Sequence, residues 1–196
     1  MIKYASNDFL ALKISYINEI ANLCEKVDAN VEDVAIGMGM DSRIGDKFLK
    51  AGIGYGGSCF PKDTKALQYI AKEHGCDLKT INATIEVNDR QKKKLIEKAK
   101  KYYRSFKGIK IAVLGLTFKP NTDDLRESPA LDNIPVLIKE NAIIKVYDPA
   151  GENNFKKIYP SELIYCDSIE ETLEETELCL IFTDWKSIKQ IDMNLL

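Results

Sequence analysis

The run Ile109-Lys110-Ile111-Ala112-Val113-Leu114, closed by Gly115, decides the fold of the carboxy-terminal half of this chain. Apolar runs of this length indicate buried strands, and helical patterns separate this run from those that follow. We expect strands at 109–114, 143–147 and 178–183, and helices at 129–140 and 168–173. This βαβ series predicts a parallel sheet with covering helices, the first of which Pro135 is expected to kink.

The turn after the first strand, Gly115-Leu116-Thr117-Phe118-Lys119, bears on what the sheet can bind. It lacks the G-x-G-x-x-G spacing that lets a backbone approach a pyrophosphate, so this sheet is not expected to be a primary NAD site. Ligands of open α/β sheets nevertheless bind at the carboxyl ends of the strands. Phe118, Lys119 and Asp148 are therefore expected at a binding edge.

The half that precedes the sheet reads as helices, beginning with a long one at 3–27. Its first apolar row is Leu10, Ile14, Ile17, Ala21 and Cys24, its second is Phe9, Leu12, Tyr16, Ile20 and Leu23, and its polar stripe is Ser15, Asn18, Glu19 and Asn22. A helix this apolar has to be covered on most sides. A homodimer interface is the expected cover, and a place at the centre of a monomeric bundle is the alternative.

Further helices are expected at 31–37, 61–74 and 80–106. The last carries many Lys and Arg residues in its second half, but acidic residues dilute them and no aromatic row interleaves, which favours a solvated face over nucleic-acid binding. The fold class is therefore α/β. An all-helical domain at 1–90 is joined by the long helix to a Rossmann-like parallel-sheet domain at 91–196.

Gly54-Tyr55-Gly56-Gly57-Ser58-Cys59-Phe60-Pro61-Lys62-Asp63 is the run with the clearest chemistry. A glycine-rich turn brings Cys59 to the start of a helix, where Pro61 suits the first position. The unpaired N–H groups, the positive end of the helix dipole and Lys62 are expected to favour the thiolate, which makes Cys59 a candidate nucleophile. The alternative is a small, inert cysteine beside a turn.

Lys3, Asn7 and Asp63 are candidates to assist this thiol. Lys3 and Asn7 are four residues apart and share one helix face, so an amine and an amide project together. Beside a thiol they could stabilise an oxyanion, although surface lysines usually have no special role. Asp63 could orient or deprotonate a water, or could merely cap the helix that begins at Pro61.

Composition narrows the function classes. The formal net charge of −2 gives no electrostatic case for a nucleic acid or a membrane surface as partner, so a small-molecule ligand is expected. Five cysteines without zinc-like spacing and one histidine make a metal site improbable. With no signal peptide and no run of roughly 18 apolar residues, a soluble protein of the reducing cytoplasm is expected.

Three blocks together carry a resemblance. The Gly54–Asp63 run is similar to the active-site signature of the UDP-glucose/GDP-mannose dehydrogenase family. Lys3-Tyr4-Ala5-Ser6-Asn7, leading into Ile17-Asn18-Glu19, resembles the start of that family's central helix. Gly115-Leu116-Thr117-Phe118-Lys119-Pro120, with Asp124, Arg126, Glu127 and Ser128, resembles its carboxy-terminal nucleotide-sugar motif.

The resemblance implies a four-electron oxidation of the C6 alcohol of UDP-glucose to a carboxylate, with NAD as cofactor. It makes Cys59 the covalent nucleophile, Lys3 and Asn7 the oxyanion pair, and Asp63 the group that assists water. The other matched residues comprise a loop that encloses the nucleotide sugar, contacts from the second domain, a cofactor contact and an arginine that reaches the partner subunit's diphosphate. The loop comprises Phe48, Leu49, Lys50, Ala51, Gly52 and Gly56, and the contacts from the second domain are Phe118 and Lys119. Arg126 is the cofactor contact, and Arg43 is the arginine that reaches the partner subunit's diphosphate.

The family's amino-terminal NAD-binding domain has no counterpart before Met1, so the isolated chain is expected to be inactive. Two other functions stay open. One is a dehydrogenase for another nucleotide sugar, such as GDP-mannose or a UDP-N-acetyl-hexosamine. The other is a non-catalytic module for dimerisation and nucleotide-sugar binding.

Overall fold

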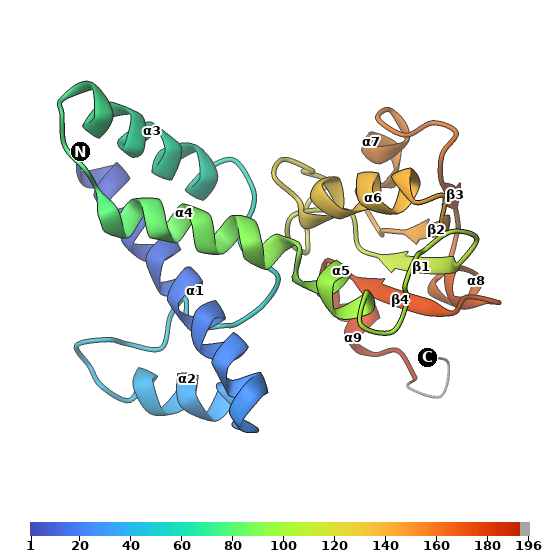
Figure 1. Cartoon of the computed structure of the whole chain (residues 1–196), viewed down its shortest axis with the longest axis horizontal. Helices are drawn as coiled ribbons and strands as arrows, with labels where there is room; N and C mark the ends of the chain where they lie inside the picture. The colour runs from blue at the N-terminus through green and yellow to red at the C-terminus, as the bar shows by residue number, and fades with distance from the viewer. Residues whose placement is uncertain (193–196) are drawn as a thin grey trace. The chain divides into compact units, whose positions relative to one another are not determined.

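The computed structural model describes residues 1–192 and separates the chain into two compact units, Met1–Lys92 and Lys93–Leu196. The first unit is helical, as predicted (Figure 1). Its helices are α1 (Ile2–Val27), α2 (Val31–Gly39), α3 (Phe60–Glu73) and α4 (Lys79–Lys92). Helices α3 and α4 both pack against α1, so α1 is the central element of this unit.

Part of the polar stripe of α1 faces inward, whereas Glu19 is exposed. Ser15 and Asn18 are fully buried, and the Ser15 hydroxyl donates to the carbonyl oxygen of Thr84 on α4 at 2.9 Å. The second apolar row is the exposed one, since Phe9 is 62% and Tyr16 47% exposed. Hydrogen bonds to neighbouring backbone explain this orientation, because they satisfy polar groups that burial would otherwise penalise.

Two predicted helix boundaries need correction. Helix α3 begins at Phe60, one residue earlier than expected, and ends before Gly75, which has a φ of +68°. The long helix expected at 80–106 is not formed: α4 ends at Lys92, and α5 (Lys94–Ala99) is a separate helix of the second unit. The buried residues of α5, Ile96 and Ala99, pack within that second unit, so one continuous apolar stripe was the wrong interpretation.

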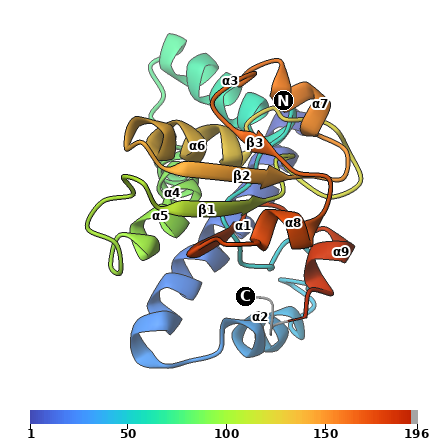
Figure 2. The same cartoon turned by 90° about the vertical axis from the view of Figure 1, so that its right-hand side faces the viewer.

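The second unit contains the predicted parallel sheet, with strands in the order β3-β2-β1-β4 (Figure 2). Three expected strands and two expected helices are present as β1 (Lys110–Leu114), β2 (Ile143–Tyr147), β4 (Leu178–Ile181), α6 (Pro129–Lys139) and α8 (Ile169–Leu173). The short elements α7 (Glu152–Lys156), β3 (Ile164–Tyr165) and α9 (Lys186–Lys189) were not predicted. Parallel pairing registers Lys110 of β1 with Ile143 of β2.

The core of this unit lies around β1, whose residues from Ile111 to Leu114 are completely buried. Helix α8 packs against β1 and β2, and α6 packs against β2. Pro135 lies on the exposed side of α6, and the helix continues through it to Lys139. A proline is tolerated there because the carbonyl it leaves unpaired can be hydrated.

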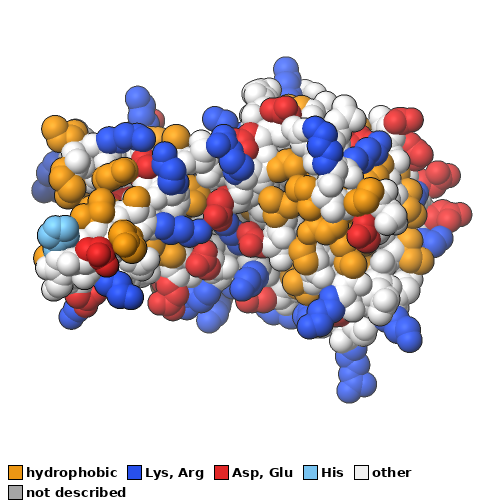
Figure 3. All heavy atoms as spheres, turned by 90° about the horizontal axis from the view of Figure 1, so that it is seen from above, with side chains coloured by type: hydrophobic (Ala, Val, Ile, Leu, Met, Phe, Trp, Pro, Cys, Tyr) orange, Lys and Arg blue, Asp and Glu red, His pale blue; other side chains and the backbone are white. Residues whose placement is uncertain are grey.

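Charges are mixed on the face of the molecule that Figure 3 shows, where Lys and Arg side chains alternate with Asp and Glu. Lys92, in the basic run, is buried. Within residues 1–192, no helix has the length and apolar character needed to cross a membrane.

Candidate active site

Cys59 lies at the amino-terminal end of α3, and its side chain is exposed. The turn that precedes it includes Gly57, whose φ of +81° glycine adopts at little steric cost. The backbone N–H of Asp63 donates to the Cys59 carbonyl at 2.8 Å, which closes the first helical turn. The Cys59 sulfur lies 3.9 Å from the Ser58 hydroxyl oxygen. The chain therefore presents a free thiol on the first turn of a helix.

Lys3 and Asn7 of α1 converge on Asp63 of α3. The Asn7 side-chain amide donates to Asp63 Oδ2 at 2.6 Å, and Lys3 Nζ lies 3.3 Å from the same oxygen. Lys62 Nζ lies 3.8 Å from the other oxygen, Oδ1. The predicted pairing of Lys3 and Asn7 on one helix face is confirmed, and the shared partner is a carboxylate 56 residues further along the chain than Asn7.

The environment of Asp63 keeps it ionised. Its side chain is 0% exposed, and burial by itself would raise its pKa. The hydrogen bonds from Asn7 and Lys3 and the charges of Lys3 and Lys62 outweigh burial, so the pKa of Asp63 lies below its ordinary value. An ionised, tethered carboxylate one helical turn from a thiol can accept a proton from a water.

The glycine-rich loop before Cys59 is held by side-chain amides of the surrounding helices. The Asn18 oxygen accepts from Gly52 N at 2.8 Å, and Gln91 Nε2 donates to Gly52 O at 2.6 Å. Asn88 accepts from Tyr55 N at 2.7 Å and donates to Tyr55 O at 3.0 Å. Sequence reasoning missed this clamp. The available signal was Asn88 and Gln91 three residues apart on the helix that follows the loop.

Aromatic contacts and a backbone constraint shape the rest of the predicted sugar loop. The Phe60 ring lies edge-on to Phe48 and Tyr55, with centroid separations of 5.9 and 5.8 Å. Phe48 has a φ of +66°, which is uncommon for a bulky residue and marks a tightly determined backbone. Leu49 is buried, and Gly56 is half-buried.

Cavities adjoin this loop. Leu49, Lys50 and Ala51 contribute to one of about 410 Å³, which α2 also lines. Arg43 and Leu49 contribute to another of about 360 Å³, together with Phe9, Leu12, Lys13, Tyr16, Met38 and Ile44. The predicted loop therefore has room beside it in the first unit.

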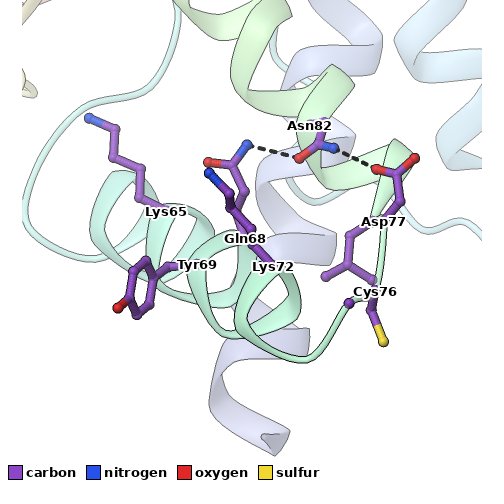
Figure 4. Close-up of a pocket in the computed structure, with 9 residues that line it drawn as sticks. Lys65, Gln68, Tyr69, Lys72, Cys76, Asp77 and Asn82 are labelled. Atoms are coloured by element: carbon purple, nitrogen blue, oxygen red, sulfur yellow. Dashed lines mark hydrogen bonds between the residues drawn. The ribbon is translucent and has the colours of Figure 1, made fainter.

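A wider cavity of about 700 Å³ lies elsewhere, between α3 and the start of α4 (Figure 4). There Gln68 donates to Asn82, which in turn donates to Asp77. None of the residues that line it is a predicted site residue, and Cys59 is not among them. Size alone does not make it the reaction site, because catalysis requires the reacting groups.

The two predicted arginines share one local arrangement. Arg43 is paired with Asp41, Nη2 to Oδ2, at 2.6 Å, and Arg126 with Asp124 at 2.7 Å. In each case the guanidinium also donates through Nε to the aspartate two residues before it. These pairs orient exposed guanidinium groups that can bind phosphate in a bidentate manner.

In the second unit, Phe118 is half-buried, and Lys119 is exposed with its Nζ 5.3 Å from the Phe118 ring centroid. Asp148 follows β2, as expected, but it is buried, and both of its carboxylate oxygens accept hydrogen bonds from within the second unit. It accepts from the backbone N–H groups of Leu116, Thr117, Ala150 and Gly151, from the Thr117 hydroxyl and from the Trp185 indole. Asp148 is therefore structural and is not a ligand contact.

The residues after β1 do not fit the pyrophosphate of a dinucleotide. Leu116 and Thr117 direct their N–H groups to Asp148, so these donors are occupied. A Cβ at Gly115 would lie 2.5 Å from the Cβ of Thr183, so glycine is required by the protein's own close packing. This agrees with the missing G-x-G-x-x-G spacing.

Each of the two units matches a different domain of one protein family. Residues 1–90 match the central domain of the UDP-glucose/GDP-mannose dehydrogenase family, and residues 112–196 match its UDP binding domain. The chain is 52% identical to UDP-glucose 6-dehydrogenase TuaD of Bacillus subtilis over 98% of its own length and 42% of the relative's.

Solved structures agree. A UDP-glucose dehydrogenase from Pyrobaculum islandicum superimposes with a TM-score of 0.94 at 34% identity, over 97% of this chain and 44% of that one. A UDP-D-ManNAc dehydrogenase from Pyrococcus horikoshii gives a TM-score of 0.79 at 29% identity, over 98% of this chain and 43% of that one. The chain thus spans less than half the length of these relatives. With both units matched in order, the chain belongs to the UDP-glucose/GDP-mannose dehydrogenase family.

Proposed function

We propose that this chain carries the covalent-catalysis part and the nucleotide-sugar-binding part of an NAD-dependent UDP-glucose 6-dehydrogenase. The observation that carries the proposal is the convergence of Lys3 and Asn7 on Asp63, one helical turn after Cys59. Because the chain spans less than half of its relatives, the complete reaction is proposed for a dehydrogenase of full family length.

The covalent steps would use the first unit. The Cys59 sulfur adds to the C6 aldehyde carbon of the sugar, and the carbonyl oxygen takes up a proton to give a thiohemiacetal. Lys3 and Asn7, which contact Asp63 one helical turn after Cys59, are the proposed donors to the oxygen on which negative charge develops. Oxidation of this adduct gives a thioester on Cys59. Asp63 then takes a proton from the water that attacks the thioester carbon, and the C–S bond breaks to release the carboxylate.

NAD would serve as the hydride acceptor for both oxidations. The described residues do not fit its primary site, since the turn after β1 uses its N–H groups on Asp148. We therefore place the hydride acceptor outside them. Arg126, exposed and oriented by Asp124, is proposed as a cofactor contact on the evidence of the motif it shares with the family.

We propose UDP-glucose as the substrate because a relative 52% identical to this chain is named a UDP-glucose 6-dehydrogenase. The match to a UDP binding domain favours uridine diphosphate as the nucleotide part. The runner-up is another nucleotide sugar, which the likeness to a UDP-D-ManNAc dehydrogenase favours. We place the sugar in the first unit, beside Phe48, Leu49, Lys50, Ala51, Gly52 and Gly56. Phe118 and Lys119 of the second unit are proposed as substrate contacts on the evidence of the motif that they share with the family.

Turnover measured as NADH absorbance tests the proposal in a dehydrogenase of full family length that carries this chain. We expect activity with UDP-glucose and a fall in kcat of at least roughly a thousandfold in Cys59→Ser, because oxygen replaces the sulfur nucleophile. Cys76→Ser, which alters another exposed thiol, is the matched control and should retain activity. The 196-residue chain alone should form no NADH.

Other outcomes separate the alternatives. Full turnover by Cys59→Ser would exclude the covalent role. Turnover of UDP-N-acetyl-mannosamine or GDP-mannose in preference to UDP-glucose would replace the substrate but keep the mechanism. Binding of nucleotide sugars without turnover in the full-length protein would identify a non-catalytic module.

A further inference from the structure

Asp8 has a position that neither the fold nor the proposed mechanism explains. It follows Asn7 on α1 and is 1% exposed. Neither of its carboxyl oxygens has a hydrogen-bond partner in the part of the chain that the structure describes. Buried carboxyl groups in folded proteins are normally hydrogen-bonded or paired, because an unpaired buried charge is strongly unfavourable.

The charged group that acts on Asp8 is Asp63. Burial, and next the negative charge of Asp63, raise the pKa of Asp8 to about 6. Lys3 and Lys62 are within ion-pair distance of Asp63. The other helices against α1 carry charged residues at the surface: Glu32 and Asp33 on α2, and Lys79 and Glu86 on α4. Between Lys79 and Glu86, the buried polar residue of α4 is Thr84, which is uncharged.

Stability does not account for Asp8. An ionised carboxylate without hydrogen bonds, beside a second carboxylate, destabilises the folded chain at neutral pH. Asp8 is buried on α1, which packs against α3, the helix that carries Asp63, and the residue before it, Asn7, holds Asp63 at 2.6 Å. Buried carboxyl pairs of this kind are typical of sites that control proton transfer.

We propose that Asp8 is a positioning residue that pairs electrostatically with Asp63 and strengthens Asp63 as the base toward the hydrolytic water. This inference rests on the proposed function. Lys3, Asn7 and Lys62 stabilise the negative charge of Asp63, and by doing so they weaken it as a base. A second negative charge nearby has the opposite effect, so an ionised Asp8 restores part of that proton affinity.

Hydrolysis of the thioester involves the water, Asp63 and Cys59. The O–H bond of the water breaks, its proton passes to an Asp63 oxygen, and the oxygen of the water bonds to the thioester carbon. The C–S bond then breaks, and the Cys59 sulfur leaves with the electron pair. While Asp8 is ionised, the proton on Asp63 neutralises one of two adjacent negative charges. Below a pH of about 6, Asp8 holds a proton itself and this assistance is lost.

The first test measures the pair without any catalysis, by carboxyl carbon-13 NMR titration of the full chain labelled at aspartate. We expect a titration step near pH 6 that disappears in Asp8→Asn and moves to lower pH in Asp63→Asn. In Asp63→Asn the step should remain above the ordinary value of 3.8, since burial persists. Asp33→Asn, an exposed carboxylate, is the control and should leave the step unchanged. A step near pH 6 that survives in Asp8→Asn, or that Asp63→Asn does not move, would overturn the pairing.

The second test is the pH profile of kcat in a dehydrogenase of full family length. We expect Asp8→Asn to lower kcat about three- to tenfold above pH 6 and to shift the acid limb of the profile to lower pH. Asp8→Ala should behave in the same way, and Asp33→Asn should match the parent. If Asp63→Asn slows turnover but the Asp8 variants keep the pH profile of the parent, Asp8 has no positioning role, and the proposed role of Asp63 stands. If Asp63→Asn turns over normally, the proposed role of Asp63 fails, whatever the Asp8 variants do.

Discussion

At the scale of single residues, exposure separates the five thiols of the chain. Cys24 and Cys166 are buried, and Cys179 is half-buried. Burial raises the pKa of the Cys166 thiol above its ordinary value and that of Cys179 to about 11, so neither is poised to react at neutral pH. Cys59 and Cys76 are the two exposed thiols, and Cys59 is the one at the start of a helix.

We therefore predict that Cys59 is alkylated first. Limiting iodoacetamide near neutral pH, followed by mass-spectrometric mapping, should label Cys59 before Cys76, because Cys59 lies at the positive, amino-terminal end of α3. Both thiols are exposed, so a difference in their alkylation rates would reflect the local electrostatics. Faster labelling of Cys76 would contradict the assignment of Cys59 as the nucleophile.

Asp8 leads to a prediction about stability. Its pKa of about 6 in the folded chain lies above the ordinary 3.8, so the folded state binds this proton more tightly than the unfolded state. The stability that the proton supplies is complete below about pH 4 and is lost as the pH rises to about 6. Asp8→Asn should raise the free energy of unfolding by roughly 1–3 kcal/mol near pH 7.5, and by little near pH 4. Urea denaturation at both pH values measures this, and an equal gain at both would contradict it.

At the scale of elements, α4 determines the conformation of the glycine-rich loop. Asn88 pairs with both backbone groups of Tyr55, as a neighbouring strand would. Gly54 has a φ of +94°, and a Cβ there would lie 2.8 Å from the Asn88 side-chain oxygen. The loop and α4 therefore approach so closely that only glycine fits between them.

Asn88→Ala should loosen this loop. It removes both hydrogen bonds that the Asn88 side chain makes to the Tyr55 backbone, which costs roughly 1–3 kcal/mol of stability. Hydrogen exchange at residues 52–57 should accelerate more than exchange in the helices of the first unit. Asn82→Ala removes the hydrogen bonds that Asn82 of α4 makes with Gln68 of α3 and with Asp77 (Figure 4), and it should leave loop exchange near the parent rate. Equal acceleration by both variants would show that Asn88 has no special role.

At the scale of the whole molecule, the exposed row of α1 predicts a homodimer. Phe9, Tyr16 and Leu23 are 62%, 47% and 55% exposed, which is more apolar surface on one helix face than a monomer usually leaves in water. A two-fold axis through this face would cover it in both subunits. Arg43 lines the same cavity as Phe9 and Tyr16, which supports its proposed reach to a partner's diphosphate.

Light scattering tests the dimer. The parent should have twice the monomer mass of 22.1 kDa at micromolar concentration, and Tyr16→Asp should be monomeric because the interface would bury an unpaired charge. Tyr102→Asp alters a tyrosine of the second unit that is 85% exposed and should remain dimeric. A parent that scatters as a monomer would refute the interface.

Local sequence was enough to determine α3 and the strands β1, β2 and β4, because their apolar periodicity coincides with the faces that they bury. For α1 it determined the helix but not the buried face, since Ser15 and Asn18 are buried and Phe9 is exposed. It also determined that the sheet is parallel, since strands joined through helices must run the same way. The positions of Cys59, and of Lys3 and Asn7 on one face, follow from helix geometry alone. What the sequence by itself could not reveal was the function of groups whose partners are distant in the chain.

Tertiary structure decided the rest. The break between α4 and α5 arises because each helix buries its face in a different unit, which no continuous periodicity records. The partner of Lys3 and Asn7 is Asp63, and the partners of the glycine-rich loop are amides of α1 and α4. Asp8 reads in the sequence as one more polar helix residue. Only packing shows that it is buried without a hydrogen bond near Asp63, because the cost of burying a charge depends on its three-dimensional surroundings.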